Sequence, residues 1–338
     1  MIPDLVAVLL FVGVVAYGLL GGADFGAGFW DLTGGGAVRG RAPRHLIDAS
    51  LSPVWEANHT WLIYCLVMLW SGFPAAFTAI TTTLYIPLGA AALGVVLRGA
   101  GFAFRHASMR TPEQRAFGAA FALASVLTPF CFGAIAGGIA SGRVPADGGG
   151  APVGSWLNPT SVLGGVLAVL VCAYLAAVYL FVVAARAGDE RLEHYFRDRA
   201  LLSGAVTGAV SIAGIFVLRQ DAGRLFHELS HRALPLVVLA AVAGVTSLVL
   251  VRARRTAGVR AGAGAAVALV LLGWGVAQYP YLLGTHLTID DAAAPTATLW
   301  VQIGVVIAAG VLILPSLVVL FRLAGRDHLQ AEADNATH

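Results

Sequence analysis

The sequence predicts an all-α polytopic membrane protein, and three observations support this fold class. Of the 338 residues, 58% are hydrophobic and only 12% are charged, against roughly 25% charged residues in ordinary soluble domains. Apolar runs of about 20 residues, the length that crosses a bilayer as a helix, recur along the chain. The polar–apolar alternation over about 10 residues that is typical of transmembrane β-strands is missing.

Nine transmembrane spans are expected within a single integral membrane domain that covers residues 1–338. Ser52 and Pro53 are a good cap and first residue for the second span, and Gly72-Phe73-Pro74 separates the second span from the third because proline interrupts a helix. The loops 141–156 and 284–297 are small-residue or polar segments without a core of their own. The predicted spans are 5–29, 54–72, 75–97, 117–140, 157–184, 200–218, 234–251, 262–283 and 298–321.

The arginines predict the orientation of these spans. Of the 21 Arg, 17 fall in the loops after odd-numbered spans or in the C-terminal tail, with Arg98 assigned to the loop after the third span. Because basic residues accumulate on the cytoplasmic side, the N-terminus is expected outside and the C-terminus in the cytoplasm. Trp30 is one of five tryptophans near span ends, where interfacial anchors are expected.

Composition also excludes several classes of function. All 21 basic residues are Arg, so a Walker A loop and a lysine Schiff base are excluded. The net charge of +3 is small and the Arg are spread over many loops, so we expect no nucleic-acid partner. The three cysteines are isolated in apolar runs, and most of the nine His lie in predicted loops, tails or span ends. We therefore expect neither a metal nor a cofactor to be ligated by this chain.

Carboxylates inside spans are the first candidates for chemistry, because a charge in hydrocarbon is costly and is usually functional. Asp24 lies about five residues from the inner end of the first span, roughly 7 Å deep. Glu56 begins the second span at the same face, and helical spacing places His59 beside it, with Asn58 nearby. These groups could pass protons inward. Alternatively, Glu56 and His59 are interfacial residues that reach headgroups, and Asp24 makes a structural hydrogen bond.

Two further features have structural interpretations. Gly18, Gly22 and Gly26 recur every four residues, a smooth stripe that lets another helix approach closely and shields Asp24 from lipid. The segment from Tyr279 to Leu283 is expected to be a kinked helix end, followed by an Asp-rich turn at Asp290-Asp291.

The motifs around these residues resemble those of subunit II of cytochrome bd-type quinol oxidases. Gly22-Ala23-Asp24-Phe25-Gly26-Ala27-Gly28 is similar to the family's G-x-D-x-G-x-G signature. Trp55-Glu56-Ala57-Asn58, followed by Trp61-Leu62-Ile63, resembles its W-[DE]-[GA]-N-x-x-W-L element. The nine-span plan and the stretches 279–283 and 287–292 are also similar, so the resemblance covers essentially the whole chain.

The resemblance implies two four-helix bundles plus one peripheral helix, in a heterodimer with a haem-bearing subunit I in the bacterial cell membrane. Subunit I would hold haems b558, b595 and d, while the complex oxidises quinol, reduces oxygen to water and takes protons from the cytoplasm. Glu56 would belong to the proton path, with Trp55 beside it and Asp24 near the inlet. Some members also hold a structural quinone in subunit II or bind a small single-helix subunit. The family often has an acidic residue where this chain has Gly21, which leaves Asp24 alone at the inlet.

Two other classes of function stay open at this point. One is a scaffold that stabilises a haem subunit while protons pass elsewhere. The other is a proton-coupled secondary transporter that uses Asp24 and Glu56, against which stands the lack of a pair of broken helices at mid-depth in matched halves.

Overall fold

The computed structural model describes residues 1–36, 39–51, 55–107, 111–285 and 287–336, with the side chains of 51, 55–56, 102, 105–107, 111–115, 314, 317 and 320–336 excepted. Within these ranges the regular secondary structure is helical apart from one two-stranded hairpin. The elements are α1 (Ile2–Thr33), α2 (Arg41–Leu51), α3 (Trp55–Gly72), α4 (Pro74–Thr83), α5 (Tyr85–Ala107), α6 (Thr111–Ala140), α7 (Pro159–Arg186), α8 (Glu190–Asp221), α9 (Gly223–Ser230), α10 (Leu234–Arg252), α11 (Val259–Gln278), β1 (Tyr281–Leu283), β2 (Leu287–Thr288), α12 (Ile289–Ala292) and α13 (Thr296–Ala336).

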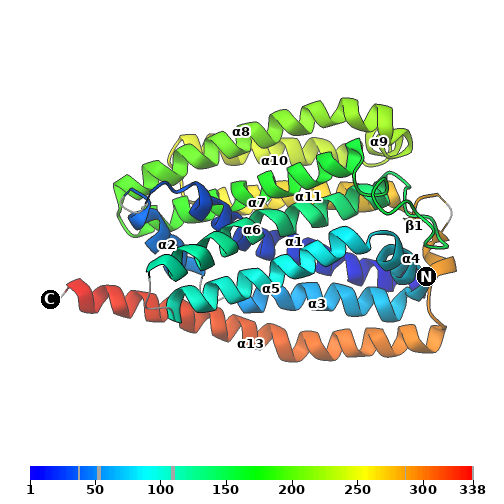
Figure 1. Ribbon diagram of the computed structural model, residues 1–338, viewed down its shortest axis with the longest axis horizontal. Helices are drawn as coiled ribbons and strands as arrows, with labels where there is room; N and C mark the ends of the chain where they lie inside the picture. The colour runs from blue at the N-terminus through cyan, green and yellow to red at the C-terminus, as the bar shows by residue number, and fades with distance from the viewer. Residues whose placement is uncertain (37–38, 52–54, 108–110, 286, 337–338) are drawn as a thin grey trace.

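The long helices run side by side along the long axis of the molecule, as Figure 1 shows. The N-terminus, α4, α9 and the hairpin lie at one end, and α2 lies at the other. One group of neighbours is α1, α3, α5 and α6, and a second is α7, α8, α10 and α11; α1 and α6 join the groups by packing on α7. Helix α13 packs on α1 and α3 at the edge.

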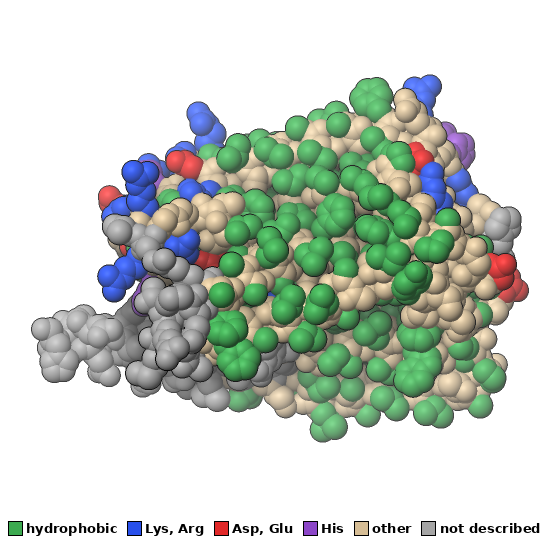
Figure 2. All heavy atoms as spheres, in the orientation of Figure 1, with side chains coloured by type: hydrophobic (Ala, Val, Ile, Leu, Met, Phe, Trp, Pro, Cys, Tyr) green, Lys and Arg blue, Asp and Glu red, His purple; other side chains and the backbone are tan. Residues whose placement is uncertain are grey.

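Several of these helices have the length and composition of membrane spans. Among the described residues, seven helices are long and apolar enough to cross a bilayer, and an eighth span results if α3 and α4 count as one bent element. Helix α5 adds a shorter apolar segment, Tyr85–Gly101. Figure 2 shows a largely hydrophobic middle on one face, with Arg side chains gathered at the end that contains α2. The chain is therefore a polytopic helical membrane protein.

The predicted span 75–97 is divided in two, which corrects the sequence interpretation. Residues 74–83 form the short helix α4, inclined at 117° to α3, and α5 begins only at Tyr85. Pro87 explains the break, because it cannot donate a hydrogen bond to the carbonyl of Thr83 and its ring would clash with that carbonyl. At its other end α5 continues past the predicted end of the span to Ala107. Arg98 therefore lies inside a helix and not in a loop.

The predicted helix end at 279–283 is also wrong. Helix α11 stops at Gln278, and Tyr281–Leu283 forms strand β1, which pairs antiparallel with β2. Pro280 ends the helix because it has no N–H for the next helical hydrogen bond. The turn that follows is short: Thr288 caps α12, and its hydroxyl accepts a hydrogen bond from the Asp291 N–H at 3.1 Å.

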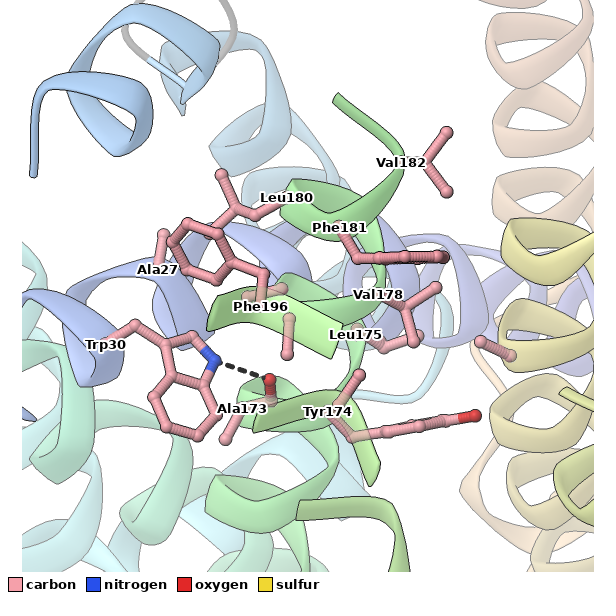
Figure 3. Close-up of a cluster of buried hydrophobic side chains, with 14 of the residues drawn as sticks. Ala27, Trp30, Ala173, Tyr174, Leu175, Val178, Leu180, Phe181, Val182 and Phe196 are labelled. Carbon is pink, nitrogen blue, oxygen red and sulfur yellow. Dashed lines mark hydrogen bonds between the residues drawn. The ribbon is translucent and has the colours of Figure 1, made fainter. Parts of the chain in front are cut away.

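Helix α7 is the centre of the larger hydrophobic core. Its side chains from 173 to 184 are almost all buried, together with Trp30 of α1 and Phe196 of α8. The Trp30 Nε1–H donates to the carbonyl oxygen of Ala173 at 2.8 Å, as Figure 3 shows. Trp30 is thus a buried contact between α1 and α7 and not the interfacial anchor that its position near a span end suggests.

Candidate functional site

Asp24 lies deep in the protein, because its helix approaches α7 very closely. A Cβ atom at Gly26 would overlap the backbone carbonyl of Cys172, and one at Gly22 would meet the side chains of Leu175 and Cys172. The prediction that the glycine stripe permits close helix approach is confirmed. Asp24 is 1% exposed, and it lies nine residues before the end of α1, roughly 13 Å along the helix. It therefore lies farther from the end of its helix than the predicted span boundary implies.

The partner of Asp24 is Arg98, which the sequence analysis placed in a loop. The Arg98 Nη2–H donates to the Asp24 carboxylate Oδ1 at 2.7 Å and to the Asp24 carbonyl oxygen at 3.0 Å. The Arg98 Nη1–H donates to Ser125 Oγ of α6 at 3.2 Å. The guanidinium carbon lies 4.8 Å from the ring centroids of both Phe25 and Phe121. The ion pair is thus enclosed between α1, α5 and α6.

His59 lies on the α3 side of this cluster. Its ring centroid is 5.9 Å from that of Phe25 and 6.2 Å from that of Tyr17. Phe25 directly follows Asp24 on α1, so the contact between His59 and Phe25 brings these two predicted site residues into one neighbourhood. Asn58 is buried, at 6% exposed. Of the predicted set, His59 therefore lies near Asp24, toward the α2 end of both helices.

The other two predicted residues, Trp55 and Glu56, begin α3. Their side chains lie outside the described residues, so their contacts are not part of the geometry above. The backbone still places Glu56 three residues before His59 on one helix, the spacing at which side chains share a helix face.

A second polar cluster lies at the end of the molecule away from α2. Asp221, the last residue of α8, accepts hydrogen bonds from Arg143 Nη1 at 3.0 Å, Thr160 N at 3.0 Å and Thr160 Oγ1 at 2.6 Å. Arg143 Nη2 also pairs with the other carboxylate oxygen. This arrangement connects the loop after α6 to α7 and α8. We interpret it as a structural ion pair that holds these elements together.

Helix α9 carries His227-Glu228-Leu229-Ser230-His231, a spacing that on longer helices binds zinc. The two imidazole rings stack with centroids 4.2 Å apart, and the Nδ1 of His231 hydrogen-bonds to the His227 carbonyl at 2.8 Å. Zinc sites in proteins use at least three protein ligands, and the described part of the chain contains no group of three or more His, Cys, Asp and Glu that could hold a metal.

Known proteins match this chain in sequence and in fold. Residues 2–324 match the family model described as cytochrome bd terminal oxidase subunit II. The cytochrome bd ubiquinol oxidase subunit 2 of Bacillus subtilis is 23% identical over 79% of this chain and 78% of its own length. A putative cytochrome bd menaquinol oxidase subunit II from the same organism is 21% identical over 96% of both chains.

A solved structure agrees with these relatives. In the bd oxidase from Geobacillus thermodenitrificans, one chain superposes with a TM-score of 0.77 at 25% identity, covering 95% of this chain and 98% of that one. The fold, the motifs and the family model therefore lead to one assignment. The chain belongs to the cytochrome bd terminal oxidase subunit II family, and it is a subunit of a membrane-bound oxidoreductase complex.

Proposed function

We propose that the chain supports the haem-bearing subunit I of a quinol:oxygen oxidoreductase in the bacterial cell membrane and contributes to proton uptake from the cytoplasm. In this proposal subunit I ligates haems b558, b595 and d, and the complex oxidises quinol and reduces oxygen to water. The proposal is compatible with two further components: a small single-helix subunit in the complex and a structural quinone held by this chain. The family match favours this function over a proton-coupled transporter.

We further propose the nine-span arrangement with the N-terminus outside and the C-terminus in the cytoplasm. The two groups of four neighbouring helices, with α13 at their edge, support two four-helix bundles plus one peripheral helix. The Arg side chains at the α2 end support a cytoplasmic location for that end.

The observation that carries the proton-uptake proposal is the convergence of buried polar groups near the α2 end. Asp24 and Asn58 are both buried, and the ring centroid of His59 lies 5.9 Å from that of Phe25, the residue after Asp24. Ionisable groups buried in a membrane protein are usually part of an ion or proton pathway. Glu56 precedes His59 by about one helical turn and is proposed as the proton-carrying group, with Trp55 beside it.

The experiment that tests this proposal replaces Glu56 by Gln in the complex purified through a tag on this chain. We expect the dithionite-reduced haem spectrum to stay as in the wild type and quinol-driven oxygen uptake to fall at least tenfold, because a neutral amide cannot carry a proton. The matched control is Asp198→Asn, which neutralises a carboxylate whose side chain is 73% exposed.

The outcomes separate the two parts of the proposal. If Glu56→Gln assembles with haem and turns over like the wild type, Glu56 has no role in proton uptake. If the tagged chain, crosslinked before extraction, brings no haem-bearing partner and no oxygen uptake, the oxidase function itself is wrong.

A further inference from the structure

Arg98 is a buried cation inside helix α5, and the proposed function gives it no role. Its side chain is 3% exposed and that of Asp24 is 2% exposed. The two residues are 74 positions apart in the chain and come from α5 and α1. Two aromatic rings, one from α1 and one from α6, flank the guanidinium at 4.8 Å, which is the range of a cation–π contact.

The hydrogen bonds make Arg98 the link between three helices. It binds Asp24 at both the carboxylate and the backbone carbonyl of α1, and it binds Ser125 Oγ of α6. Ser125 is itself held, because its hydroxyl donates to the Phe121 carbonyl at 2.7 Å. A lysine has one compact ammonium and cannot reproduce this planar set of donors.

The pair also restricts what Asp24 can do with a proton. Protonating the carboxylate would leave Arg98 as an unpaired cation in a water-excluded site, and an uncompensated buried charge is strongly destabilising. The titratable groups that face Asp24 are Tyr17 on its own helix, His59 on α3, Arg98 on α5 and Cys172 on α7. Helix α6 contributes the hydroxyl of Ser125, which carries no charge, and the side chain of Glu56 on α3 lies outside the described residues.

We propose that Arg98 is a positioning residue that holds Asp24 permanently as a carboxylate, so that the pair is a fixed charge couple beside the proton path and Asp24 does not carry protons. This inference rests on the proposed function, and it decides between the two roles that the sequence left open for Asp24. One oxygen of Asp24, Oδ1, is engaged by Arg98. The other, Oδ2, is buried without a hydrogen-bond partner among the described residues and keeps its capacity to accept a hydrogen bond.

The test compares Asp24→Asn, Arg98→Gln, Arg98→Lys and the double variant Asp24→Asn/Arg98→Gln in the assembled, haem-containing complex. Oxygen uptake per haem is measured at saturating quinol across the pH range in which the complex is stable. Each single neutral variant leaves one buried charge unpaired, so we expect haem incorporation to fall severalfold. The double variant removes both charges, and we expect it to recover at least half of the wild-type haem content and turnover.

The pH profile distinguishes positioning from a purely structural role. Without Arg98, Asp24 is no longer held charged, so Arg98→Gln acquires a titration step that the wild type, Arg98→Lys and the double variant lack. The inference is overturned if the double variant assembles with normal haem but loses turnover as completely as Asp24→Asn. It is equally overturned if the wild type shows a step that Asp24→Asn abolishes.

A charge-conserving variant keeps the test decisive if the neutral variants fail to assemble. Asp24→Glu preserves the ion pair, and redox-induced infrared difference spectra then compare it with the wild type. We expect no protonated-carboxyl band that shifts between the two complexes, and such a band would refute the inference. Failure of this inference can be distinguished from failure of the proposed function, because the wild-type complex must first show quinol-driven oxygen uptake before any of these variants is compared with it.

Discussion

The contact between α1 and α7 at Gly26 gives a prediction that follows directly from the geometry. In Gly26→Ala the new Cβ would overlap the carbonyl oxygen of Cys172 and lie 2.8 Å from the Cβ of Ala176. The obstacle is backbone of a central helix, which cannot move aside as the end of a flexible side chain can. Helices α1 and α7 must therefore separate, and the buried Asp24 moves with α1.

The magnitude follows from two opposing terms. Replacing glycine by alanine within a helix favours folding by about 1 kcal/mol, while forcing extra atoms into a close-packed contact costs about 1–3 kcal/mol or more. Gly208→Ala supplies the matched control, because nothing lies within 4 Å of a Cβ at that position. We expect Gly26→Ala to be about 3 kcal/mol less stable than Gly208→Ala, or roughly 6 °C in unfolding midpoint at about 2 °C per kcal/mol.

The assay is thermal unfolding of the purified complex, followed by the loss of its monodisperse size-exclusion peak after heating. Gly22→Ala is the graded intermediate, because its Cβ would lie 3.3 Å from the flexible Cδ1 of Leu175, and we expect a midpoint close to that of the wild type. Equal midpoints for Gly26→Ala and Gly208→Ala would refute the reasoning that the stripe exists for close helix approach.

The remaining predictions concern the cluster around Asp221, the core and metals. Asp221→Asn weakens the charge-assisted bonds from Arg143 and Thr160 and should cost about 1–3 kcal/mol in thermal stability with turnover per haem unchanged; a loss of turnover at normal stability would contradict a structural role. Trp30→Phe removes the hydrogen bond to Ala173 and should cost about 1 kcal/mol, measured by the same heating assay, so a stability equal to the wild type would count against it. Dialysis against EDTA should leave the haem spectrum and oxygen uptake unchanged; stoichiometric release of zinc together with lost uptake would contradict the expectation that His227 and His231 hold no metal.

The candidate site was partly predictable from the sequence. The carboxylate Asp24 stood out because it interrupts an apolar run, and the four-residue glycine period showed on which side another helix would approach. Its cation, Arg98, was misassigned because the span was ended at Leu97. The apolar pattern continues through Gly99 to Phe104, so a single Arg inside a longer span was the available signal.

Prolines account for the errors in element boundaries. Pro87 lies three residues after Leu84, the residue between α4 and α5, and Pro280 lies two residues after Gln278, where α11 ends. Both lie within apolar runs, so composition alone continues a span through them. A rule that ends a helix about four residues before an internal proline would have separated α4 from α5. The same rule fails at Pro129 and Pro315, which lie inside α6 and α13, because neighbouring helices can accommodate a proline kink in a membrane protein.

The pairing between helices was beyond reach for a physical reason. In water, a helix shows its buried side by an apolar stripe, but lipid is as apolar as a protein core, so hydrophobicity does not distinguish the two surroundings. Helices α7 and α10 are both almost wholly apolar, yet α7 is the centre of the core and α10 is largely exposed along its length. The two helices differ in the size of their side chains. Helix α7 carries the small residues Cys172, Ala173, Ala176 and Ala177 on the stretch that α1 approaches, while α10 presents Val and Leu outward. In this chain the size of the side chain, and not its polarity, indicates which surface meets another helix. The Asp24–Arg98 pair crosses such a surface, so it is the place where a single substitution says most about function.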